Sequence, residues 1–65
     1  PDRPDLSGLE QREIAVFEAL GYDPVSTDAL ALATGLPADQ LMQALLLLEL
    51  QGLAGSAPGG YLRLA

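Results

Sequence analysis

The longest periodic stretch of this chain, residues 37–52, has the pattern of an amphipathic helix. At about 3.6 residues per turn, Leu41, Leu45 and Leu48 fall on one stripe, and Ala44 lies beside it. A stripe of this kind is the face that a helix buries. We therefore expect these side chains to form the centre of the core.

Both ends of this helix carry residues that start and stop helices. Pro37 is tolerated in the first turn because the N–H that it lacks would have no partner there, and Asp39 suits the positive end of the helix dipole. Gly52 can adopt the left-handed conformation that ends a helix.

The opposite face of this helix is unusual for a surface in water. Gln43, Leu46 and Leu50 lie nearly opposite the buried stripe, and Leu47 lies to one side, so this face carries large apolar groups and no cation. Either the hairpin or the first helix folds over part of it, or it is left uncovered. We predict that the uncovered part is a protein interface made by Leu46, Leu47, Leu50 and Gln43.

The first helix should begin after Ser7, which matches a capping box with Glu10. It should run to about Leu20, with Gly21 as the left-handed glycine beyond its end. Glu13 interrupts its apolar side. We expect the Glu13 carboxylate to reach solvent at the edge of that side, because buried carboxylates are rare.

A turn at residues 21–24 and an extended Val25 lead to a short second helix, capped by Ser26 or Thr27. Gly35 then permits a tight connection to the long helix. Two helices joined by a short turn that contains glycine predict a helix-turn-helix.

The end of the chain predicts a β-hairpin, because a Pro-Gly-Gly turn at residues 58–60 separates two short runs. Strand alternation places Tyr61 and Arg63 on one face and Leu62 and Leu64 on the other. A hairpin that follows a helix-turn-helix is a wing.

These elements predict an α+β fold: a winged helix-turn-helix of three helices, a C-terminal hairpin wing and a short strand at Val25, after the first helix. Residues 1–6 are expected to be the end of a linker, and residues 7–65 the domain. The expected core collects the inward apolar residues of every element: Leu9, Val16, Phe17, Leu20, Val25, Leu30, Leu36, Leu41, Leu45, Leu48, Leu53 and Leu62.

Composition excludes most chemistry. The 65 residues include no cysteine and no histidine, and the carboxylates are dispersed along the chain. No nucleophile is paired with a base, so we expect no enzyme activity, no metal and no cofactor. The apolar runs are too short to cross a membrane, and the lack of cysteine fits a reducing compartment, the cytoplasm.

Charge disfavours direct DNA binding. Nine acidic residues outnumber three arginines, and the net charge is −6. A typical stand-alone DNA binder neutralises about six to ten phosphates with Lys and Arg. Gln40, and Arg63 with Tyr61 on the wing, are weak candidates for nucleic-acid contact, and we expect Arg63 to pack its stem on the Tyr61 ring instead.

Three segments carry a resemblance to a known family. They are Thr34-Gly35-Leu36, the segment from Leu45 to Leu53 with its pattern Leu-Glu-Leu-x-Gly at residues 48–52, and Pro58-Gly59-Gly60-Tyr61 followed by Arg63. With them the chain resembles, over about residues 6–63, the C-terminal winged-helix domain of DprA (Smf), the DNA-processing protein of bacterial natural transformation.

The resemblance implies a parent protein whose Rossmann-like domain binds single-stranded DNA and helps to load RecA. The DNA-binding lysines and arginines of that family belong to the Rossmann-like domain, so none carries over to this chain. Pro37 stands where most winged helices offer Ser or Thr, and this departure also disfavours base reading.

We therefore expect an interaction module that acts mainly through protein contacts. The expected partner is a second copy, the parent's Rossmann-like domain or a RecA-like recombinase, and single-stranded DNA would be bound through the parent. The alternative is a winged helix that binds DNA directly.

Overall fold

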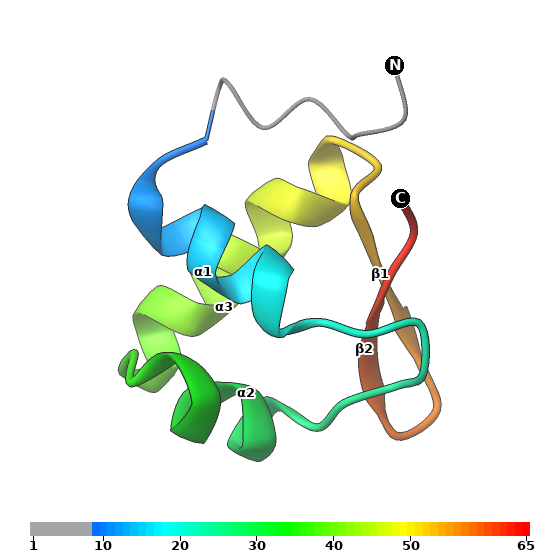
Figure 1. The fold of residues 1–65 in the computed structure, drawn as a ribbon, viewed down its shortest axis with the longest axis horizontal. Helices are drawn as coiled ribbons and strands as arrows, with labels where there is room; N and C mark the ends of the chain where they lie inside the picture. Colours follow the sequence, from blue (N-terminus) through cyan, green and yellow to red (C-terminus); the bar gives the residue numbers. More distant parts are fainter. Residues whose placement is uncertain (1–8) are drawn as a thin grey trace.

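The computed structural model describes residues 9–65, which form three helices followed by two strands. In chain order these are α1 (Gln11–Ala19), α2 (Thr27–Thr34), α3 (Ala38–Leu50), β1 (Ala54–Ala57) and β2 (Gly60–Arg63). The helices pack together on one side, and the β1–β2 hairpin stands beside them (Figure 1). The predicted α+β arrangement is confirmed, and the predicted linker at residues 1–6 lies outside the described residues.

α1 begins later than the sequence predicted. Ser7 lies outside the described residues, but Leu9 and Glu10 precede the helix, and Glu10 is its extended N-cap residue. The Glu10 N–H donates a hydrogen bond of 2.9 Å to Glu13 Oε1. The side chain of Glu13, the third residue of α1, thus provides a hydrogen-bond acceptor for the N–H of the N-cap residue Glu10.

The end of α1 also differs from the prediction. Leu20 leaves the helix in an extended conformation, with φ −75° and ψ 141°, and Gly21 has no positive φ. The Gly21 carbonyl instead accepts a hydrogen bond of 2.8 Å from the Arg63 N–H. The chain therefore passes directly from α1 to the edge of the sheet, and no left-handed glycine closes the helix.

α2 and α3 form the predicted helix-turn-helix. The two axes differ by 105°, within the range typical of this motif. The Ser26 hydroxyl accepts a hydrogen bond of 3.1 Å from the Ala29 N–H and so caps α2. Gly35 has the left-handed conformation that ends α2, with φ 73°, and this lets α3 start within a short connection.

The wing is a two-stranded hairpin, and Val25 adds a single β-bridge to it. β1 and β2 pair antiparallel, with Ala54 opposite Arg63 and Ala57 opposite Gly60. On the other edge of β2, Val25 and Tyr61 exchange two backbone hydrogen bonds of 2.8 and 2.9 Å. The extended residue predicted at Val25 is confirmed, but it forms a single β-bridge and not a strand. It ties the segment between α1 and α2 to the hairpin (Figure 1).

The face of the wing that packs against the helices is the opposite of the predicted one. Leu62 is half-buried and lies outside the core cluster, whereas Tyr61 packs against that cluster. Ala54, opposite Arg63, is buried at the centre of the same face. A small residue at this position brings the hairpin close to the helices, and the aromatic ring of Tyr61 covers more core surface than Leu62 would.

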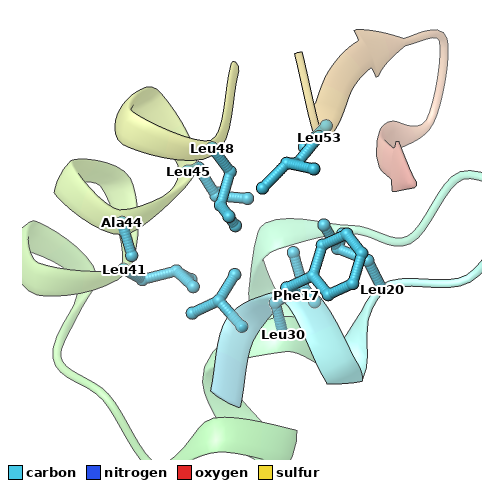
Figure 2. Close-up of a cluster of buried hydrophobic side chains, with 10 residues drawn as sticks. Phe17, Leu20, Leu30, Leu41, Ala44, Leu45, Leu48 and Leu53 are labelled. Carbon is cyan, nitrogen blue, oxygen red and sulfur yellow. The ribbon is translucent and has the colours of Figure 1, made fainter. Parts of the chain in front are cut away.

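The core joins all three helices to the base of the wing. Figure 2 shows that the leucines of α3 converge on Phe17 and Leu30, together with Leu53, the residue before β1. Predicted core residues Leu9, Val25 and Leu36 are half-buried at its margin. The buried apolar residues are Val16, Phe17, Leu20, Leu30, Leu41, Ala44, Leu45, Leu48, Leu53 and Ala54.

Leu45→Ala should reduce the free energy of unfolding by about 2–5 kcal/mol, because Leu45 is fully buried and truncation leaves a cavity. Urea or thermal denaturation measures the loss. Leu50→Ala, on the exposed side of the same helix, is the matched control and should change stability by less than about 0.5 kcal/mol. Equal losses in the two variants would contradict the orientation of α3.

Gly60→Ala should destabilise the wing by at least about 1–3 kcal/mol. Gly60 has φ 144°, and a Cβ there would overlap the Val25 carbonyl and lie 2.9 Å from the Ser26 nitrogen. Gly21→Ala is the control, since its φ is not positive and its Cβ would have no neighbour nearer than 4.0 Å. Denaturation curves of the two variants that coincide would argue against this strand contact.

Candidate functional site

The outward face of α3 is the candidate functional surface. The burial of the other side of α3 determines which residues this face contains, because Leu41, Leu45 and Leu48 pack against α1, α2 and β1. Packing of that stripe leaves the other side of the helix in solvent. Neither the wing nor α1 covers Leu46 or Leu50, since both are exposed.

Three apolar side chains form a row along this face. Met42, Leu46 and Leu50 are 44%, 58% and 76% exposed, and their spacing of four residues aligns them along the helix. We call these residues the apolar row. Met42 is missing from the predicted interface, although its position four residues before Leu46 would have identified it.

The remaining predicted interface residues flank the apolar row. Gln43 is exposed and Leu47 is half-buried, so the four predicted residues do lie on one accessible side of α3. Asp39 stands in the first turn and Glu49 near the end of the helix, and α3 carries no basic residue. The face is therefore apolar along its middle and anionic towards both ends.

Arg12 is bound within the fold by a buried carboxylate. Its Nε donates a hydrogen bond of 2.7 Å to Glu13 Oε2, and Glu13 is only 1% exposed. The expectation that the Glu13 carboxylate reaches solvent is wrong. Two donors, Arg12 Nε and the Glu10 N–H, replace the water that it loses on burial.

The charge of Glu13 is held by these contacts. The hydrogen bond from Arg12 keeps the pKa of Glu13 below its ordinary value, although burial acts in the opposite direction. The same hydrogen bond raises the pKa of Arg12. Arg12 and Glu13 thus form a structural ion pair at the start of α1.

Arg63 is also engaged by the fold. Its guanidinium carbon lies 4.1 Å from the centre of the Phe17 ring and 5.7 Å from that of Tyr22, and its Nε donates to the Ala65 carbonyl oxygen at 3.0 Å. The aromatic partners are therefore Phe17 and Tyr22, and not the predicted Tyr61. The cation–π interaction of Arg63 with Phe17 stabilises the contact between β2 and α1.

The weak nucleic-acid candidates are distributed over two elements. Gln40 is exposed on the first turn of α3, whereas Tyr61 and Arg63 are half-buried on the inward side of β2. Their side chains are thus presented differently, Gln40 to solvent and Tyr61 to the core.

Residues 9–65 contain no pocket and no cluster of metal-ligating side chains. Among these residues, no single helix is long and apolar enough to span a membrane. Only α2 and α3 taken together have the required length and apolarity, and a bend of 105° separates them.

Comparison with known families decides the identity of the fold. The model of the DprA winged helix domain matches residues 1–60. The chain belongs to the DprA winged helix domain family. No curated protein and no solved structure gives a significant match.

The family assignment confirms the resemblance inferred from the sequence and the winged-helix fold. A DprA winged-helix domain is a non-catalytic module of a DNA-processing protein of transformation. In this DprA winged-helix domain, the described arginines are both held by intramolecular contacts, while the apolar row is accessible.

We expect the DprA winged-helix domain to show no salt-dependent DNA binding. Arg12 is paired with Glu13 and Arg63 is stacked on Phe17, so neither is free to neutralise a phosphate. Fluorescence anisotropy of labelled single- and double-stranded oligonucleotides at low salt measures this. Micromolar binding that falls steeply with salt would favour direct DNA binding instead.

Glu13→Gln should lower stability most at neutral pH. The pKa of Glu13 is lower in the folded chain, so its ionised form stabilises the fold above the ordinary pKa, about 4.3, and this contribution is lost as pH falls through the folded-state pKa. The difference in unfolding free energy between Glu13→Gln and the unchanged chain should therefore narrow below about pH 4.

Urea denaturation at a series of pH values measures that difference. Glu18→Gln removes an exposed carboxylate from the same helix and controls for the change in net charge. A difference for Glu13→Gln that stays constant with pH would show that the ion pair does not contribute.

Proposed function

We propose that this DprA winged-helix domain is a non-enzymatic interaction module that acts through protein contacts. Its parent protein would bind single-stranded DNA through another domain and aid the loading of a RecA-like recombinase in natural transformation and recombination, in the cytoplasm. The DprA family assignment supports the role of the parent. The surface of α3 supports the role of the domain.

The observation that carries this proposal is the accessibility of Leu46 and Leu50 on the longest helix. Each exposes more than half of its side chain, at 58% and 76%, and Met42 extends the same row. Isolated exposed leucines are common on protein surfaces, but neighbouring ones form a continuous apolar patch. Such patches of a few hundred Å² often mark contact surfaces.

The charges of the domain support protein over nucleic acid as the direct partner. The net charge is −6, and a surface of this sign repels phosphates at long range. Candidate partners are a second copy, the Rossmann-like domain of the parent and a RecA-like recombinase. Each would bury the apolar row.

The double substitution Leu46→Glu with Leu50→Glu should abolish association without unfolding the domain. Both residues are exposed, so the fold does not depend on them, but two carboxylates in the contact would be costly to bury. Sedimentation velocity of the domain, alone and mixed with a RecA-like recombinase, measures association. Thermal denaturation verifies the fold.

Leu32→Glu is the matched control, because Leu32 is 88% exposed and belongs to a different helix, α2. This variant should associate like the unchanged domain. Association that persists in the double variant would contradict the proposal, as would association that Leu32→Glu removes equally.

A further inference from the structure

We infer that the occupant of the apolar row is a basic amphipathic helix of another protein surface, and not a second copy of this domain. The inference rests on the proposed function, since it names the chemistry of the partner at the same surface. It follows from the shape of the row, from the charges that flank it and from the absence of cations along α3.

The apolar row is shaped for a helix. Met42, Leu46 and Leu50 are spaced at i, i+4 and i+8, so the row is a ridge that extends about 12 Å along the helix at a shallow angle to its axis. Residues 9–65 contain no pocket, so a single protruding side chain would find no cavity to fill. An elongated apolar stripe on a partner helix can instead pack along the whole row.

The charges on α3 define the flanks of that partner. Asp39 lies one turn before Met42, and Glu49 lies one turn after Leu46, about 15 Å from Asp39 along the helix axis. Neither carboxylate forms an ion pair within residues 9–65, where the ion pairs involve Arg12 with Glu10 and Glu13. A partner helix with Lys or Arg at both ends of its apolar stripe would complement both.

A second copy lacks this chemistry. Pairing two α3 helices would bring together two chains of net charge −6 without any basic residue on either helix. Such repulsion opposes association.

A synthetic peptide tests the assignment. The probe is a helix of about 18 residues, long enough to be helical in isolation, with Leu at i, i+4 and i+8 and Lys beyond both ends of this stripe. A second peptide carries Glu in place of each Lys, and a third has the first composition in scrambled order. Fluorescence anisotropy of each labelled peptide with the domain gives Kd.

The Lys peptide should bind, and the other two should not. Leu46→Ser with Leu50→Ser should weaken its binding by at least about tenfold. Asp39→Asn with Glu49→Gln should weaken it by about two- to thirty-fold, the effect of two exposed ion pairs. Raising salt from about 0.1 to about 1 M, which shortens the Debye length from about 10 to about 3 Å, should have a similar effect. Leu32→Ser is the control and should leave Kd unchanged.

The outcomes separate this inference from the proposed function. Equal binding of the Lys and Glu peptides, lost in the leucine variant, would overturn the basic partner but retain an apolar protein interface. If the domain associates with itself and the leucine variant abolishes this association, a second copy is the occupant. That result would also overturn the basic partner but retain an apolar protein interface. No binding of the Lys peptide, or binding that is insensitive to Leu46 and Leu50, would overturn the inference, and the sedimentation experiment would then decide the proposed function alone.

Discussion

Burial of one stripe of α3 organises the whole domain. Leu41, Leu45 and Leu48 lie at the centre of the core, where they meet Phe17 of α1 and Leu30 of α2 (Figure 2). In so small a fold only one side of the helix is buried, so the residues on the opposite side are exposed to solvent, including apolar ones. The exposed apolar row is therefore a direct consequence of how the core is assembled.

The two arginines of residues 9–65 form contacts within the fold. Arg12 compensates the buried charge of Glu13 at the start of α1, and Arg63 lies over Phe17 where β2 meets that helix. Within residues 9–65, these two arginines both stabilise the fold and are both engaged by intramolecular contacts. A winged helix is commonly associated with DNA, but a DNA contact depends on the cations that a surface offers and not on the fold. In this domain the surface of α3 offers leucines and carboxylates.

The wing shows how backbone contacts override side-chain pattern. Its inward face is selected by the pairing of Tyr61 with Val25, which requires Gly60 to lie against the Val25 carbonyl. Once that pairing is made, alternation along β2 sends Leu62 outward and Tyr61 inward. Apolar character would have favoured the leucine face, but the strand partner determines which side meets the helices.

Local sequence determined the elements of this protein, because helical periodicity, capping residues and glycine turns act over a few residues. The inner stripe of α3, a cap of α2 at Ser26 or Thr27 and an extended Val25 were all predictable. The accessible positions of Leu46 and Leu50 followed from the same periodicity. Only the tertiary structure decided the inward side of the wing, the burial of Glu13 beside Arg12 and the stacking of Arg63 on Phe17. The inward side of the wing and the stacking of Arg63 depend on partners that are distant along the chain. The hydrogen-bond partners of Glu13 are local, Arg12 and the Glu10 N–H, but its burial depends on how α1 packs in the fold.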